Sequence, residues 1–197
     1  MIFNNTERNQ EDKFFTSEDF SSLSLVGYSF YNCTFERCIF INSTLIDTKF
    51  YSCVFNECNW SFVTVKDSLL QDIMFNECKL VGIDFYKVNK IFFNVTFKQS
   101  NLLNCNFSDL NMKKTSFTGS RLKECIFKNT QLEEADFTNT DLPESVFRNC
   151  NLTKANFGCA KNYSLDISVN NVKKAQFSYR EVMCLLKYFD IIINYKQ

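Results

Sequence analysis

Residues 94–157 read NVTFKQSNLLNCNFSDLNMKKTSFTGSRLKECIFKNTQLEEADFTNTDLPESVFRNCNLTKANF and carry the most regular pattern in the chain. A large apolar residue stands at every fifth position. These core slots are Phe97, Leu102, Phe107, Met112, Phe117, Leu122, Phe127, Leu132, Phe137, Leu142, Phe147, Leu152 and Phe157. A period of five matches neither a helix nor a strand, so either element would scatter these side chains over all faces. The chain must therefore turn a corner at each repeat.

A second period of twenty residues indicates how many corners complete one coil. Phe97, Phe117 and Phe137 are separated by twenty residues, and leucines and further phenylalanines repeat in the same way. Identical residues that stack in successive coils interdigitate without voids. We predict an all-β fold, a right-handed quadrilateral β-helix. This solenoid has about seven coils, spaced about 4.8 Å apart, and forms a rod roughly 34 Å long.

The same period runs through residues 20–85. Its slots are Phe20, Leu25, Phe30, Phe35, Phe40, Leu45, Phe50, Phe55, Trp60, Val65, Leu70, Phe75, Leu80 and Phe85. The next slot, Phe92, follows Phe85 by seven residues, so two extra residues lie within 86–91. We expect a corner bulge there, with Tyr86, Lys87, Asn89 and Lys90 protruding. A structural irregularity is the favoured interpretation, and a functional loop is the alternative.

The small residue two positions before each slot faces inward in this arrangement. Eight of the ten cysteines occupy that position: Cys33, Cys38, Cys53, Cys58, Cys78, Cys105, Cys125 and Cys150. Stacked side chains one coil apart are further apart than a disulfide prefers. The chain has no His and no C-x-x-C pair, which disfavours a zinc site. We interpret these cysteines as buried structural thiols.

The repeat resembles that of the pentapeptide-repeat family, whose unit is a small residue, Asp or Asn, Leu or Phe, and two polar residues. Ala135-Asp136-Phe137-Thr138-Asn139 matches this unit closely. The resemblance covers most of the chain and implies the fold. Its best-known functional relatives, of the Qnr, MfpA and McbG type, shield type II topoisomerases by imitating DNA, and they dimerise through their C-terminal ends. Fold alone does not establish that activity here.

Composition indicates a single domain of 197 residues. Lys plus Arg equals Asp plus Glu, so the formal net charge is zero and no global field favours nucleic acid. No segment resembles a signal peptide, and no apolar run approaches the roughly 18 residues of a membrane span. We expect a soluble, cytoplasmic protein that contacts neither nucleic acid nor membrane directly.

The two ends depart from the repeat. Residues 1–19 are polar and acidic, and we expect a lead-in that caps the first coil of a solenoid over residues 20–157, or else a peptide that docks on a partner. Residues 158–197 contain an irregular segment, one partial repeat around Phe177, and a predicted α-helix at about 178–190. Ser178 and Glu181 suggest a capping box at its start.

The apolar face of this helix is the candidate cap and dimer surface. It contains Val182, Met183, Leu185, Leu186 and Phe189, followed by Ile191. The helix can cover the last coil, present an apolar strip to a second copy, or do both. We expect the cap, and we expect a homodimer through this end.

An acidic cluster in the second half is the candidate partner-binding surface. It consists of Glu124, Glu133, Glu134, Asp136, Asp141 and Glu144. At a spacing of twenty, Lys113 lies over Glu133, Lys114 and Lys154 flank Glu134, and Arg121 lies over Asp141. These cross-coil pairs neutralise much of the cluster and leave Asp136 and the Glu124–Glu144 stack unpaired. Arg37 is likewise expected over Glu57. A self-paired, solvated surface is the favoured interpretation, and a DNA-like acidic patch is the alternative.

Catalysis finds little support in the residues. There is no His for acid–base work and no glycine-rich phosphate loop, and a convex solenoid offers no deep pocket. We expect no enzyme activity and no cofactor. The function hypothesis is an interaction protein that presents a rigid surface to a macromolecule, in its sharper form a DNA mimic that binds DNA gyrase or topoisomerase IV. The alternative is a scaffold unrelated to DNA.

Overall fold

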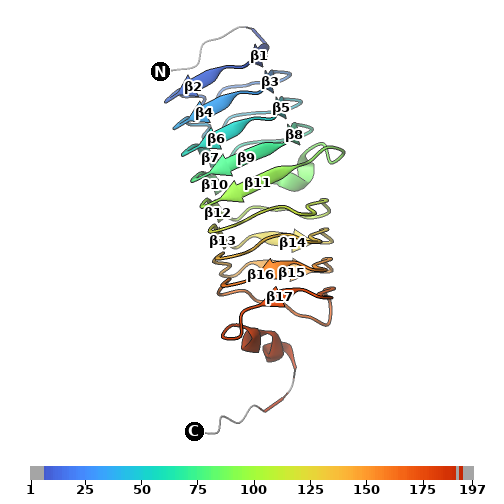
Figure 1. Cartoon of the computed structure of the whole chain (residues 1–197). Coiled ribbons are helices and arrows are strands. Elements are labelled where there is room, and N and C mark those ends of the chain that lie inside the picture. Colours follow the sequence, from blue (N-terminus) through green and yellow to red (C-terminus); the bar gives the residue numbers. More distant parts are fainter. Residues whose placement is uncertain (1–6, 190, 193–197) are drawn as a thin grey trace.

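The computed structural model describes residues 7–189 and 191–192 of the chain. It is a β-solenoid of about eight turns, whose coils stack along one axis from the N-terminal to the C-terminal end of the rod (Figure 1). Each turn has four sides of about five residues, as the repeat predicts. Helical structure is confined to two short 3₁₀ segments, η1 and η2, within the described residues.

The four sides carry parallel ladders. The first side has β1 (Asn9–Glu11), β3 (Ser29–Tyr31), β5 (Lys49–Tyr51) and β8 (Leu69–Gln71). The second side has β2 (Phe14–Thr16), β4 (Thr34–Glu36), β6 (Val54–Asn56), β9 (Ile73–Asn76) and β11 (Val95–Lys98), continued by β16 (Asn156–Phe157) and β17 (Gln176–Phe177). The third side has β7 (Asn59–Ser61), β10 (Lys79–Val81), β12 (Asn101–Leu103) and β13 (Arg121–Lys123). The fourth side has β14 (Ile126–Lys128) and β15 (Val146–Arg148).

The register between coils confirms the period of twenty. Phe30 of β3 lies opposite Phe50 of β5, and Phe127 of β14 lies opposite Phe147 of β15. Where no strand is assigned, single bridges such as Asn111 to Gln131 maintain the same offset. Core residues therefore stack directly on core residues along every side, and in many places the two residues are identical.

The core is a set of apolar columns, one per side. Apart from Phe92, all the core slots predicted from the sequence are buried. The second side is entirely phenylalanine: nine rings stack with centroids 4.6–5.4 Å apart. They are Phe15, Phe35, Phe55, Phe75, Phe97, Phe117, Phe137, Phe157 and Phe177. This unbroken column makes the rod stiff, because each coil packs on the next along its whole length.

The corners depend on a left-handed residue two positions after each slot. Asn129, Asn139 and Asn149 have φ values of 54°, 58° and 54° there. Asparagine and aspartate tolerate this conformation better than most residues. Phe62 is an exception, since it adopts φ 59° with its ring 58% exposed.

The insertion lies in a range that overlaps the predicted residues 86–91. Neighbouring coils are still offset by twenty residues where the Asp67 amide donates to the Lys87 carbonyl at 2.9 Å. The offset is 22 residues where β9 pairs with β11. The extra residues therefore lie after Lys87 and before Val95, next to η1 (Phe85–Lys87). Figure 1 shows this segment projecting from the rod.

The prediction that Phe92 fills the next core slot is wrong. Phe92 is 56% exposed and Ile91 is 77% exposed, whereas Phe93 is buried. The physical reason is the pleat of β11: side chains alternate along an extended chain, so Phe93, Val95 and Phe97 point inward together. Of the four residues expected to protrude, Lys87 and Lys90 are exposed while Tyr86 and Asn89 are half-buried.

The first coil begins before Phe20. β1 pairs with β3 and β2 pairs with β4, so part of the expected lead-in of residues 1–19 already belongs to the solenoid. Because the solenoid starts earlier than predicted, it has about one turn more than the seven predicted. Gln10 occupies a core slot and is 1% exposed, and its side-chain amide donates to the Glu7 carbonyl at 2.7 Å.

At the other end, the predicted α-helix over 178–190 is wrong in type and length. The chain forms the 3₁₀ helix η2 (Val182–Tyr188), in which the Cys184 amide donates to the Glu181 carbonyl at 3.1 Å. No side-chain cap is present, because the Ser178 hydroxyl instead accepts the Cys159 amide at 2.6 Å. The capping box is therefore absent. Asp190, where the helix was predicted to end, lies outside the described residues.

Within the described ranges, no helix has the length and apolar character needed to cross a bilayer.

Candidate partner-binding surface

The six carboxylates of the predicted acidic cluster do not share one side of the rod. Glu133 flanks the first side, and Glu134 occupies the corner after it. Asp136 stands on the second side and Asp141 on the third, as their bridges to Ser116 and Arg121 show. Glu124 and Glu144 lie at the next corner, where both adopt left-handed φ values of 55° and 60°. A cluster that is compact in sequence is thus wrapped around the coil.

The predicted cross-coil ion pairs are present. Lys113 Nζ lies 2.9 Å from Glu133 Oε2, Lys154 Nζ lies 2.9 Å from Glu134 Oε1, and Lys114 Nζ lies 3.8 Å from Glu134 Oε2. The Lys154 ammonium, and Lys114 with it, lowers the pKa of Glu134 below its ordinary 4.5. Such exposed pairs each stabilise the fold by about 0 to 1 kcal/mol. Their main effect is to remove net charge from this surface.

Asp141 is paired in the same way, since its carboxylate accepts from the guanidinium of Arg121 one coil away. The expected pair between Arg37 and Glu57 is not among the ion pairs of the described residues.

Asp136 is held by hydrogen bonds rather than by a cation. Its Oδ1 accepts from the Thr138 amide at 2.9 Å and from the Thr138 hydroxyl, and its Oδ2 accepts from the Thr118 hydroxyl at 3.2 Å. The network continues to Asn156, whose amide nitrogen donates to Thr138 Oγ1 at 2.9 Å. The carboxylate is half-buried and fixed in position. It offers a partner a defined acceptor, with its charge not neutralised.

The expectation that Glu124 is unpaired is wrong. Lys123 Nζ lies 3.2 Å from Glu124 Oε1, an ion pair between sequence neighbours that a spacing of twenty does not anticipate. The geometric reason is the corner: the left-handed turn at Glu124 brings its side chain back toward Lys123. Glu144 is exposed and takes part in none of the ion pairs of the described residues.

Sequence reasoning missed a second group of carboxylates on the N-terminal half. Glu36, Glu57 and Glu77 border a surface hollow of about 310 Å³ along the second side. Between them the Asn76 amide donates to Asn56 Oδ1 at 2.8 Å, and the Asn56 amide donates to Glu36 Oε2 at 3.1 Å. The signal was present, because Glu57 and Glu77 are twenty residues apart.

The eight cysteines at the small inward position are all free and buried. Their thiols donate to main-chain carbonyls of the neighbouring coil, as Cys58 Sγ does to Phe35 O at 3.3 Å. Burial raises the pKa of Cys150 above its ordinary 9.0. These are the buried structural thiols that the sequence predicted.

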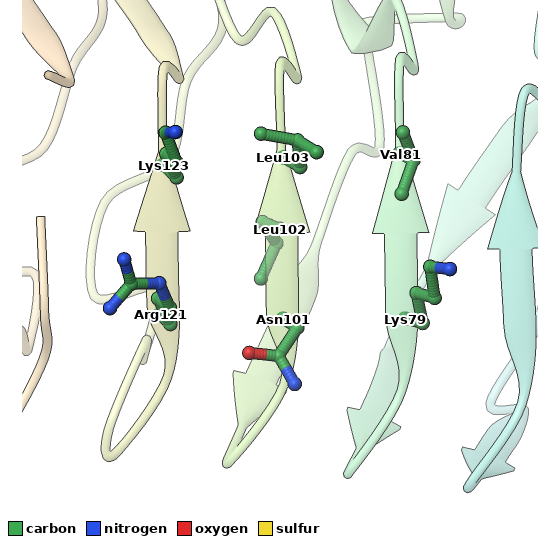
Figure 2. A pocket seen from close by; sticks show the side chains of 7 residues that line it. All are labelled: Lys79, Val81, Asn101, Leu102, Leu103, Arg121 and Lys123. Atoms are coloured by element: carbon green, nitrogen blue, oxygen red, sulfur yellow. The ribbon is translucent and has the colours of Figure 1, made fainter. Parts of the chain in front are cut away.

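A third surface feature is a basic groove on the third side (Figure 2). Its volume is about 310 Å³. It is lined by Lys79 and Val81 of β10, Asn101, Leu102 and Leu103 of β12, and Arg121 and Lys123 of β13. No acidic residue lines it, which sets it apart from the self-paired surface elsewhere.

The C-terminal end divides the predicted cap and dimer residues into two groups. Leu185 is 6% exposed, and Val182 packs against the core, so this part of η2 covers the last coil. Leu186 is half-buried. Met183, Phe189 and Ile191 are 38%, 41% and 53% exposed, and we refer to these three apolar residues as the C-terminal strip.

Comparison with known proteins agrees with this architecture. The family model described as "Pentapeptide repeat region" matches residues 28–91 and 88–157. A trypsin-treated form of QnrB1, a plasmid-mediated fluoroquinolone resistance protein, is 21% identical with a TM-score of 0.52, over 95% of this chain and 94% of that chain. HetL, a pentapeptide repeat protein involved in heterocyst differentiation regulation from the cyanobacterium Nostoc sp., is 14% identical with a TM-score of 0.40, over 87% of each chain. No curated protein matches the sequence significantly.

The likeness to the trypsin-treated QnrB1 structure supports a shared fold and no shared activity, because the identity is only 21%. The family match is different, since it extends over most of the repeat. The chain belongs to the pentapeptide-repeat family.

Proposed function

We propose that this chain is a non-enzymatic interaction protein that presents the side of a rigid solenoid to a macromolecular protein partner. The observation that carries the proposal is the unbroken stack of coils. It fixes rows of outward side chains at a constant spacing of about 4.8 Å, so a partner meets a surface that does not rearrange. A pre-organised surface avoids much of the ordering cost of binding.

In its sharper form, the partner is a type II topoisomerase, DNA gyrase or topoisomerase IV, and the rod imitates DNA. The likeness in fold and length to QnrB1, a fluoroquinolone resistance protein, supports this form. Asp136 and Glu144, which lack cation partners among the described residues, and Glu124 at the adjoining corner are its candidate contacts. Glu133, Glu134 and Asp141 are engaged with lysine or arginine and would contribute less.

The test is a gyrase supercoiling assay with and without a quinolone. We expect the protein to inhibit supercoiling or to relieve quinolone poisoning, and the triple variant Glu124→Lys, Asp136→Lys, Glu144→Lys to lose the effect. The matched control reverses three exposed carboxylates outside this group and changes the net charge equally: Glu11→Lys, Asp47→Lys, Asp67→Lys. No effect at micromolar protein, or equal loss in both triples, refutes the topoisomerase form and leaves the interaction protein standing.

A scaffold unrelated to DNA is the second candidate. It is favoured by the cross-coil ion pairs and by the distribution of the acidic cluster over three sides, since a DNA mimic needs one continuously acidic side. This form predicts partner binding that is insensitive to both triple reversals.

We also propose a homodimer through the C-terminal strip of Met183, Phe189 and Ile191. Exposed apolar residues at one end of a rod suit a two-fold contact. Light scattering should give twice the chain mass, and Ile191→Asp should give the monomer. The control is Val146→Asp on the fourth side, because Val146 is 51% exposed and Ile191 53%. A monomeric wild-type protein at high concentration refutes the dimer.

A further inference from the structure

The groove on the third side is lined by three cations and by no carboxylate. Several cations of the rod pair with an acid twenty residues later, as Lys113 does with Glu133. In the groove, Lys79 of β10 lies in register between Asn59 of β7 and Asn101 of β12. No carboxylate therefore lies directly opposite Lys79 in either neighbouring coil. It also takes part in none of the ion pairs of the described residues.

Besides Lys79 on β10, the groove has two cations on β13, at its other end. Arg121 and Lys123 each reach one carboxylate outside the lining, Asp141 and Glu124 respectively. The guanidinium of Arg121 has five N–H donors, so one carboxylate does not exhaust it. Its side chain is 52% exposed and that of Lys123 is 40% exposed. Both cations remain accessible to a second anion.

The middle of the groove is apolar. Val81 and Leu103 lie in register on adjacent strands, and Lys123 follows Leu103 in the next coil. Figure 2 shows these three side chains in one row, with Lys79, Asn101 and Arg121 in the other. Leu103 is 37% exposed at the centre. Across the three coils, the lining thus has a cation on β10, an aliphatic centre at Val81 and Leu103, and cations on β13.

We propose that this groove is a docking site for an acidic peptide segment of a protein partner, of the pattern acidic–apolar–acidic. The apolar side chain packs on Val81 and Leu103, one carboxylate pairs with Lys79, and the other reaches Arg121 and Lys123. The first and third coils are about 9.6 Å apart, and alternate residues of an extended peptide are about 7 Å apart. Flexible acidic and basic side chains span the difference. The proposal does not rest on the DNA-mimic form of the function, whose candidate contacts are the carboxylates Glu124, Asp136 and Glu144.

A peptide fits the groove better than a nucleic acid does, because it brings a single carboxylate near Glu124 and Asp141, whereas a phosphate backbone carries an anion at every nucleotide. A volume of about 310 Å³ holds one side chain with its flanking backbone. An open groove of this size predicts weak binding, with a dissociation constant of roughly 0.1 to 1 mM for an isolated peptide.

The experiment uses the full chain and fluorescein-labelled peptides in an anisotropy titration. The probe is Gly-Glu-Leu-Glu-Gly, and the comparison peptides are Gly-Glu-Ser-Glu-Gly and Gly-Gln-Leu-Gln-Gly. We expect about tenfold weaker binding when the central leucine or both carboxylates are removed. Raising the salt from low to about 0.5 M should weaken the probe several-fold, because exposed charge pairs are screened.

Matched variants locate the site. Leu103→Glu should weaken the probe about tenfold or more, whereas Ile126→Glu should leave it within about twofold. Leu103 and Ile126 are both 37% exposed at outward positions on short strands, β12 and β14. Lys79→Glu should act like Leu103→Glu, and Lys128→Glu on β14 is its control. Melting curves confirm that each variant is folded.

Four results overturn the proposal. They are no binding of the probe at about 5 mM, equal binding of the glutamine peptide, equal loss in the Ile126→Glu control, and competition by octanoate with the same dependence on Leu103 and Lys79. The last result would make the groove a site for small carboxylates instead of a peptide dock. Methyl chemical-shift changes confined to Val81 and Leu103 would support the peptide at this position.

Discussion

Replacing Phe117 by alanine tests the argument that the phenylalanine column holds the rod together. Phe117 is fully buried in the middle of the second side. Its ring stacks on Phe97 at 5.3 Å and on Phe137 at 5.0 Å, and it meets Phe107 and Phe127 edge-on at 6.0 and 5.8 Å. The substitution removes all four ring contacts and leaves a cavity between two coils.

The expected loss of unfolding free energy is about 4 kcal/mol. Phe-to-Ala changes in cores cost about 3 to 5 kcal/mol through lost burial and the residual cavity. Well-arranged ring pairs add about 0.5 to 1.5 kcal/mol each beyond their area, which favours the upper half of that range. Phe117→Leu should cost only about 1 to 1.5 kcal/mol, because leucine keeps most of the volume. Phe92→Ala is the control, since Phe92 is 56% exposed, and it should stay within about 0.5 kcal/mol.

Urea unfolding is the assay, followed by far-ultraviolet circular dichroism and by the fluorescence of Trp60, the single tryptophan. In a linear array each coil contacts only its neighbours, so a defect at Phe117 weakens the C-terminal coils first. We expect the circular dichroism transition of Phe117→Ala to begin at lower urea than the Trp60 transition. A loss below about 1 kcal/mol, or a loss equal to that of Phe92→Ala, would refute the reasoning.

Three further predictions follow from local geometry. Gly82→Ala should destabilise the protein by about 1 to 2 kcal/mol, because Gly82 has φ +64° and a Cβ there would lie 3.0 Å from the Phe62 ring. The loss of stability should be smaller in a Phe62→Ala background. An unchanged loss would refute the steric part of the argument. In native protein at pH 8, a thiol reagent should label the exposed Cys159 and the half-buried Cys184 before the eight buried thiols. The double variant Cys159→Ser, Cys184→Ser should abolish the fast phase, and a fast phase that survives in it contradicts the burial. Lys154 lowers the pKa of Glu134, so the stability from this pair is full above pH 4.5 and is lost as the pH falls through the folded-state pKa. Glu134→Gln should therefore be less stable than wild type at pH 7. A difference in melting temperature that persists at pH 2 would contradict the pairing.

The repeat allowed almost the whole core to be predicted, and the misses have physical causes. Phe92 was placed in a core slot by counting, but the pleat of β11 selects Phe93. β1 was not foreseen because Gln10 is polar and breaks the apolar pattern, although its side chain is satisfied inside the coil. The 3₁₀ form of η2 was not foreseen because the apolar spacing of a helix face does not distinguish i→i+3 from i→i+4 hydrogen bonds.

The candidate surface was predicted less well than the core. The pairs at a spacing of twenty were read correctly from the sequence for Glu133, Glu134 and Asp141, because the register places them side by side. The pair of Lys123 with Glu124 escaped that rule, since it depends on how the corner turns its side chain. The basic groove escaped it as well, because it depends on the asparagines that lie opposite Lys79 and on a surface shape that no linear pattern records.

The sequence by itself determined the four-sided coil, its period and the identity of its core columns. The reason is that each repeat makes the same contacts with its neighbours. The spacing of apolar residues along the chain therefore also sets which residues lie opposite one another in successive coils. Only the tertiary structure decided where the first coil starts, how the insertion is absorbed, and how the chain ends. It also decided which charges meet, because surface side chains such as Lys79 and Glu144 are placed by corners and by neighbours twenty residues away rather than by their own repeat.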